Sequence, residues 1–384
     1  MTGSIEFVEE QAYDHLVASY VERVSQLPGV QGVVKFGSVT APGLSDIDLV
    51  VTITDDGPVP QWEQLSLLRH SEGHPARSVV AHDVFVWPES VARNAEAFFY
   101  VDQQTVLCGD RLGGEIDSAV CDELRDLIVM DYLIHRFESL AVLLVAPTAN
   151  LRSVLLFIST LRHSCRLAAD IGVMSLDTCE LVIADILELR LAALTQSVSQ
   201  DQLDTWPARL VEILWQLAIG LGQRLGLKSE AATRRWSPSS RQVFVNCESE
   251  DGVRSWQEYI SAQLNRWPSR YVRAAPVPSI TYSHVRQYFQ EDSDSADFMM
   301  QQLPQIFGRT PVKFAGAADA ARRLRAEAVI EHWKFVQSRG YTASSGIGYL
   351  GVATPLNQTN RSRLLNRLAR LNAWWLSSIR LSVS

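Results

Sequence analysis

The chain has 384 residues, of which 47% are hydrophobic and 20% charged, and its formal net charge is −8 at pH 7. This composition excludes a disordered or fibrous protein, and the negative charge argues against a wholly basic nucleic-acid binder. The five cysteines lack the spacing of a zinc site, and the N-terminus has neither the basic residues nor the apolar run of a signal peptide. We therefore expect reduced thiols, a cytoplasmic location and no membrane span.

The first 115 residues alternate between helical and strand patterns. Ser4 can cap a helix in which apolar residues recur at four-residue spacing from Val8 to Val24, and Pro28 and Gly29 end it. Runs rich in β-branched residues predict strands at 30–36, 47–53, 78–87 and 105–108. Helices are predicted between them at 62–69 and 90–99. Residues 1–115 are thus expected to form a small domain of helices and strands.

Beyond residue 115 the apolar residues follow the period of a helix. Periodic stretches predict helices at 122–146, 151–171, 176–198 and 203–225. We expect these helices to form a bundle over residues 116–228. Residues 229–384 are predicted to be mainly helical, with helices at 317–338 and 360–380 and a basic tail. The expected fold class is α+β, a domain with a small β-sheet followed by a mainly α-helical region.

Two acidic residues at the start of the second predicted strand are the first candidate site. Asp46 and Asp48 are two residues apart, so their side chains project from the same face of a strand. Two carboxylates at close range repel each other unless a cation lies between them. Such a pair suits transfer of a nucleotide from an NTP, in which two divalent ions roughly 3.5–4 Å apart hold the attacking and leaving oxygens. Mg²⁺ prefers these oxygen ligands.

Two further features of the sequence support a nucleotide site. Gly37 and Ser38 follow the first predicted strand, where backbone N–H groups and the serine hydroxyl can bind phosphate oxygens. Asp83, in the third predicted strand, is the candidate third carboxylate, as a proton acceptor or a metal ligand. A capping or salt-bridged acid is the other interpretation of Asp83. Lys35 either contacts a phosphate or is a solvated lysine at a strand edge.

The order FGS, a short loop, SDIDLVV and an aspartate on a later strand resembles the polymerase-β-like nucleotidyltransferase superfamily. The short loop and the helices that follow look like bacterial minimal and antibiotic-modifying nucleotidyltransferases, and the resemblance covers roughly residues 20–112. It implies a small mixed sheet, two Mg²⁺ ions with Mn²⁺ as the alternative, and ATP as the NTP. It also implies metal ligation and catalysis by Asp46, Asp48 and Asp83, and nucleotide binding by Gly37, Ser38 and Ser45.

These observations leave three functions open. The first is transfer of an NMP, expected to be AMP, to a hydroxyl of a small molecule with release of pyrophosphate. The second is the same transfer to an RNA end or a protein side chain, and the third is a catalytically silent NTP-binding module of the same fold.

The C-terminal part of the sequence bears on the second function. From Arg309 onward there are 12 Lys or Arg and 3 Asp or Glu, so this segment carries +9 and residues 1–308 carry −17. The basic tail either docks on the acidic body, touches an anionic membrane or contacts RNA.

Overall fold

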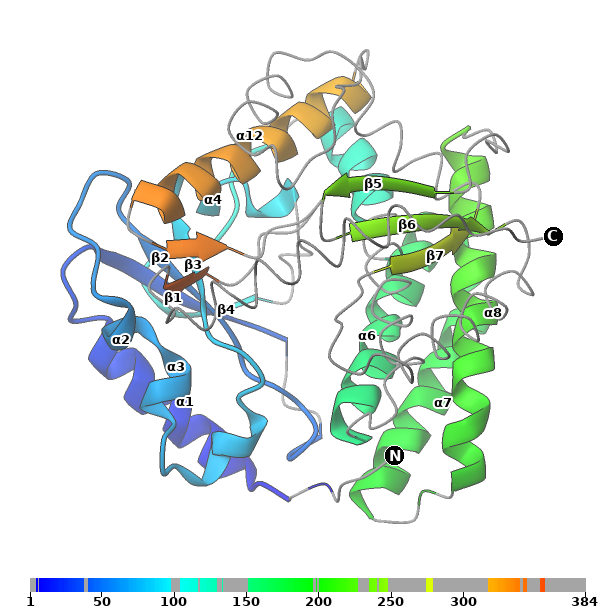
Figure 1. Cartoon of the computed structure of the whole chain (residues 1–384), viewed down its shortest axis with the longest axis horizontal. Coiled ribbons are helices and arrows are strands. Elements are labelled where there is room, and N and C mark those ends of the chain that lie inside the picture. Colours follow the sequence, from blue (N-terminus) through cyan, green and yellow to red (C-terminus); the bar gives the residue numbers. More distant parts are fainter. Residues whose placement is uncertain are drawn as a thin grey trace.

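In a computed structural model of the chain, an N-terminal sheet lies beside a group of long helices (Figure 1). The residues that the structure describes are 5, 7–37, 41–97, 104–116, 118–129, 133, 151–195, 198, 200–226, 235–239, 242–247, 274–278, 317–338, 341–343 and 353–355. Within these ranges no helix combines the length and the apolarity needed to cross a membrane. Ser38 and the helix predicted at 360–380 lie outside the described residues.

The first helix, α1 (Glu10–Val24), begins later than a cap at Ser4 predicts, and its N-cap is Glu9. Its buried side chains are spaced three and four apart and form one stripe: Tyr13, Leu16, Val17, Tyr20 and Val24. A turn at Gly29 leads into the first strand. Gly29 has a φ of +89°, and a Cβ there would lie 1.8 Å from the carbonyl oxygen of Pro58, so only glycine fits this turn.

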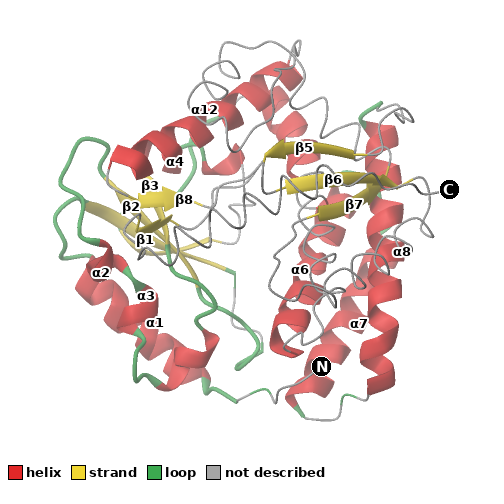
Figure 2. Cartoon of the chain, in the orientation of Figure 1, coloured by secondary structure: helices red, strands yellow, loops and turns green. Residues whose placement is uncertain are grey.

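Four strands form one mixed sheet next to α1 (Figure 2). They are β1 (Val30–Phe36), β2 (Asp48–Ile53), β3 (Phe85–Pro88) and β4 (Gln104–Cys108), in the spatial order β3-β2-β1-β4. Strand β1 pairs antiparallel with β2 and with β4, whereas β2 and β3 are parallel. The α+β class and the small mixed sheet are therefore confirmed.

Both faces of this sheet are buried at its centre, as the alternation of side chains along β1 and β2 shows. Val33, Val51 and Val86 belong to an apolar cluster that includes the buried residues of α1. Their neighbours Val34 and Val50 belong to a second cluster, which extends into the long helices. Because each fully buried side chain of this kind contributes about 1.5–3 kcal/mol, the pattern fixes which face each residue of β2 presents.

The segment between β2 and β3 departs from the prediction. Two short helices, α2 (Trp62–Leu65) and α3 (Leu67–His70), replace the single helix predicted at 62–69, because Ser66 interrupts it with an extended backbone and caps α3. The strand predicted at 78–87 is wrong in its first part. The 3₁₀ helix η1 (Pro75–Val79), with proline at its first position, precedes β3, which starts only at Phe85.

The helix predicted at 90–99 is also divided. The described residues there form α4 (Glu89–Ala92) and the 3₁₀ helix η2 (Ala95–Ala97).

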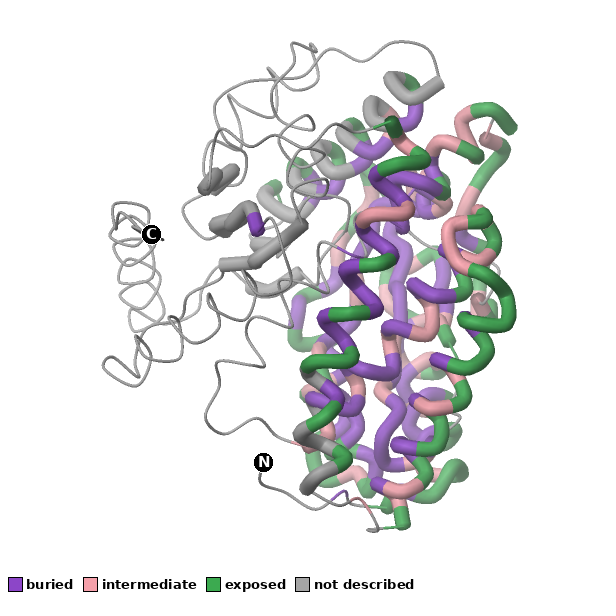
Figure 3. Tube along the Cα trace, turned by 90° about the vertical axis from the view of Figure 1, so that its right-hand side faces the viewer, coloured by how far each residue is buried: buried purple, intermediate pink, exposed green. Residues whose placement is uncertain are grey.

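The long helices match their predicted positions closely. They are α6 (Leu151–Asp170), α7 (Leu176–Leu194) and α8 (Gln200–Arg224). Residues 118–129 are also helical, and most of the helix predicted at 122–146 lies outside the described residues. Buried residues on these helices face their neighbours and exposed residues face outward (Figure 3). One continuous apolar cluster joins them to the sheet face of Val34 and Val50, so the sheet and the helices share a core.

The C-terminal part contains helix α12 (Ala317–Ser338), which has the bounds predicted from sequence. Helix α12 contacts α4, η2 and the edge strand β3, where a nitrogen of His332 lies 3.1 Å from the carbonyl oxygen of Val86. The described residues beyond 228 also form strands that the prediction of a mainly helical region lacked. These strands are β5 (Arg235–Ser239), β6 (Gln242–Cys247), β7 (Ala274–Pro278), β8 (Tyr341–Ala343) and β9 (Ala353–Pro355).

Candidate metal centre

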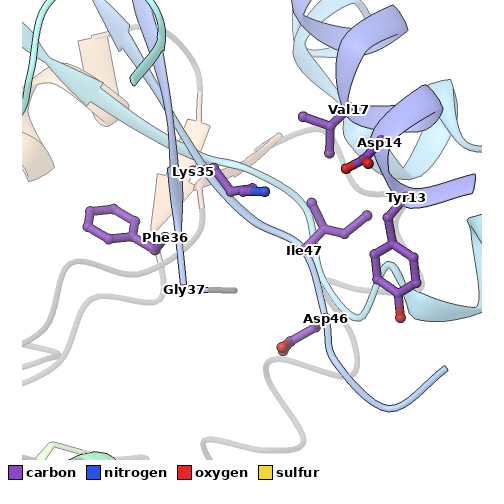
Figure 4. Close-up of a pocket in the computed structure, with 8 residues that line it drawn as sticks. All are labelled: Tyr13, Asp14, Val17, Lys35, Phe36, Gly37, Asp46 and Ile47. Carbon is purple, nitrogen blue, oxygen red and sulfur yellow. The ribbon is translucent and has the colours of Figure 1, made fainter. Parts of the chain in front are cut away.

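The predicted site residues lie where β1 ends and β2 begins. In this antiparallel pair Phe36 is opposite Asp48, so Gly37 and the loop up to Asp46 lie at the same end of the sheet. Gly37 has a φ of +69°, and within the described part of the chain no atom other than those of Gly37 and its two chain neighbours lies within 4 Å of the position that a Cβ would take. The backbone at Gly37 is therefore open to a ligand. A small pocket at this place is lined by Lys35, Gly37 and Asp46, among others (Figure 4).

Asp46 and Asp48 come together as predicted, and a histidine joins them. One ligand atom each from Asp46, Asp48 and His82 lie within 4.8 Å of one another, and all three residues are partly buried. The Nε2 atom of His82 is 2.9 Å from Oδ1 of Asp48. His82 lies three residues before the start of β3, which is parallel to β2, so His82 and Asp48 lie at the same end of the sheet. This group could hold a metal ion.

The two carboxylates and the imidazole perturb one another. Burial, together with the negative charge of Asp48, raises the pKa of Asp46 to about 6. Burial alone would lower the pKa of His82. The hydrogen bond to Asp48 and the negative charge of Asp48 outweigh burial, and the carbonyl of Asp83 and the charge of Asp46 act in the same direction. Together they raise the pKa of His82 to about 9. At neutral pH without a metal, a protonated His82 therefore partly balances the two carboxylates.

The loop that carries Asp46 is held in place by α1. The hydroxyl of Tyr13 donates to the carbonyl oxygen of Ser45 at 2.9 Å and accepts from the N–H of Gly43 at 2.8 Å. The hydroxyl of Ser45 accepts from the N–H of Ala41 at 3.2 Å. These buried bonds fix the backbone directly before Asp46. Ser45, predicted to bind nucleotide, has its hydroxyl committed to the loop, and its side chain is buried.

Two arginines from the long helices complete this support. Arg152, at the start of α6, donates from Nε to the carbonyl oxygen of Gly43 at 3.1 Å and from Nη2 to that of Val79 at 3.2 Å. Arg190, in α7, is only 4% exposed and donates to the hydroxyls of Ser45, at 3.3 Å, and Ser159. Burial lowers the pKa of each guanidinium, and the charge of Asp46 opposes that shift. The positive charges in turn favour ionisation of Asp46.

The structure does not bring Asp83 into the group of Asp46 and Asp48. Its Oδ1 accepts from the backbone N–H groups of Leu67 and Val84, at 2.7 and 3.1 Å, and its Oδ2 accepts from the hydroxyl of Ser66 at 2.7 Å. Asp83 is 6% exposed and binds the N-terminus of α3, which is the capping interpretation left open by the sequence.

The position of Asp83 has a physical reason. The register that pairs Val50 with Phe85 would place residue 83 opposite Asp48 if the strand extended that far. Because β3 starts at Phe85, the backbone before it is free to turn, and the carboxylate of Asp83 meets the N–H groups of α3 instead. His82 then occupies the place next to Asp48.

Sequence reasoning missed His82, Tyr13, Arg152 and Arg190. A signal for Arg190 was present, because it lies among the apolar, buried positions of α7, where an unpaired charge would be costly. Nothing in the sequence distinguished His82 from Asp83 without the true start of β3. Comparison of the chain with protein-family models, with curated proteins and with solved structures returned no match.

Proposed function

We propose that the chain is a metal-dependent nucleotidyltransferase, which transfers an NMP, expected to be AMP from ATP, to a hydroxyl of a small molecule. The observation that carries this proposal is the convergence of Asp46, Asp48 and His82 beside the open backbone of Gly37. A divalent ion held there would neutralise phosphate charge and orient the triphosphate. Mg²⁺ with Mn²⁺ as the alternative is the ion implied by the resemblance, and the two carboxylates suit it.

The side chains at the site have separate roles in this proposal. Asp46 and Asp48 hold the ion, and the backbone of Gly37 approaches the phosphates. The acceptor oxygen bonds to the α-phosphorus as the bond to pyrophosphate breaks, and a carboxylate oxygen of Asp46 takes the hydroxyl proton. Lys35 lines the same pocket, and in this proposal it contacts the triphosphate.

The test is release of pyrophosphate from each α-labelled NTP, with Mg²⁺ or Mn²⁺ and panels of small hydroxyl compounds. The double variant Asp46→Asn and Asp48→Asn should lose at least about a thousandfold in rate, because loss of the metal removes several kcal/mol of transition-state stabilisation. The matched control is Asp55→Asn with Asp56→Asn, which removes two exposed aspartates just beyond the other end of β2. Its rate should be unchanged.

A macromolecular acceptor is the second candidate, favoured by the charge of +9 from Arg309 onward. Pyrophosphate released only with RNA or a protein acceptor would select it. NTP binding without turnover on any acceptor would contradict both transferase proposals and leave a silent NTP-binding module.

A further inference from the structure

The donor atoms at the candidate metal centre differ from those expected by resemblance. A third carboxylate was expected, but the described residues place the imidazole of His82 with Asp46 and Asp48. Ligands about 2.1 Å from one ion lie at most about 4.2 Å apart. The three donor atoms, within 4.8 Å of one another, therefore need only small side-chain rotations to bind the same ion. The set comprises two oxygen donors and one nitrogen donor.

His82 is already oriented as metal-binding histidines are. Its Nδ1 lies 2.7 Å from the carbonyl oxygen of Asp83, and since a carbonyl can only accept, Nδ1 carries a hydrogen. The other nitrogen, Nε2, points to Asp48. The ring also meets Phe85 edge to face, with 5.3 Å between the ring centroids. A histidine that binds a metal through one ring nitrogen usually donates the N–H of its other ring nitrogen to a carbonyl or a carboxylate, and His82 has such a carbonyl at Nδ1.

We infer that His82 Nε2 is a ligand of this site, its proton leaving to solvent as the ion binds, and that the site prefers a first-row transition-metal dication to Mg²⁺. Mg²⁺ favours oxygen ligands, whereas an imidazole nitrogen favours the transition metals. The inference depends on the proposed transferase for the role of the ion. The ion's identity can be tested on the protein alone, without NTP or acceptor.

The test is binding of Mn²⁺ to the full-length, untagged chain, followed by pulsed electron paramagnetic resonance that detects ¹⁴N coupled to the metal. Wild-type protein should show a histidine nitrogen on bound Mn²⁺ and should bind Mn²⁺ more tightly than Mg²⁺. His82→Asp supplies an oxygen in place of the nitrogen. It should lose the ¹⁴N signal and lower the ratio of Mn²⁺ to Mg²⁺ affinity at least tenfold.

The control is His15→Gln, which removes an exposed imidazole that stacks on His74 with their nitrogens 3.1 Å apart. This variant should keep the ¹⁴N signal and the affinity ratio. Absence of ¹⁴N coupling in the wild-type protein would overturn the inference, even if His82→Asp fails to fold. So would loss of metal binding in Asp83→Asn together with its retention in His82→Asp.

These results are separable from those of the proposed function. Nitrogen-coordinated Mn²⁺ without nucleotidyl transfer would refute only the function. Transfer with an ion bound by oxygen alone would refute only the inference.

Discussion

The contact between α12 and β3 predicts a specific loss of stability at acidic pH. His332 is fully buried, and a ring nitrogen lies 3.1 Å from the carbonyl oxygen of Val86. Burial lowers the pKa of His332 from 6.5 to about 4, although the carbonyl of Val86 opposes the shift. Because the folded-state pKa is below the unfolded one, this histidine stabilises the contact above pH 6.5, and the contribution is lost as the pH falls through about 4.

The size of the effect follows from the two pKa values. The difference between 6.5 and about 4 corresponds to about 3 kcal/mol when the loss is complete, at about 1.4 kcal/mol per pKa unit. About 2 kcal/mol of this should already be lost at pH 5. Local opening of α12 should then become about 30-fold more frequent at pH 5 than at pH 7.5.

Hydrogen exchange measured by mass spectrometry checks this prediction. After correction for the intrinsic effect of pH, protection of residues 325–338 and 84–88 should fall between pH 7.5 and 5 in the wild-type protein. The non-titrating variant His332→Phe should start with lower protection, because it lacks the bond to Val86, but should show little of the pH dependence. Helix α7 serves as the internal reference, since its protection should change equally in both proteins. An identical pH dependence in wild type and variant would refute the reasoning.

Two further substitutions separate support of the fold from support of the metal. Asp83→Asn weakens the buried hydrogen bonds to α3, so it should lower the free energy of unfolding by about 1–3 kcal/mol in chemical denaturation and leave Mn²⁺ affinity unchanged. Full stability with lost metal binding would contradict the capping role of Asp83. Tyr13→Phe removes the hydroxyl that holds the loop before Asp46, so we expect a similar loss of stability and also weaker Mn²⁺ binding. Tyr20→Phe is its matched control, because that buried hydroxyl of the same helix donates to Leu65 instead, and equal effects of the two variants on metal binding would reject the loop argument.

The sequence was sufficient where the pattern is local. Asp46 and Asp48 come close together because they are two residues apart where β2 begins, and the pairing of Phe36 with Asp48 brings Gly37 to the same end of the sheet. The bounds of α12 could also be predicted, since its apolar residues repeat with the period of a helix.

The sequence was insufficient where distant segments compete for one position. Whether His82 or Asp83 adjoins Asp48 depends on where β3 starts, and the partner that Asp83 binds instead, the N-terminus of α3, lies 16 positions away in the chain. The contact of Arg190 with Ser45 spans 145 positions in the chain, so no local pattern could reveal it. The same limit applies to the short strands beyond residue 228.

The candidate metal ligands all lie within residues 1–115, but the loop that carries Asp46 is held by residues of the long helices as well. A fragment ending at residue 115 would retain Asp46, Asp48 and His82. It would lack Arg152 and Arg190, and the sheet face of Val34 and Val50 would lose the apolar partners supplied by the long helices. Grafting only the segment with Asp46, Asp48 and His82 into another protein would therefore transfer the metal-binding side chains without the contacts that hold the Asp46 loop in position.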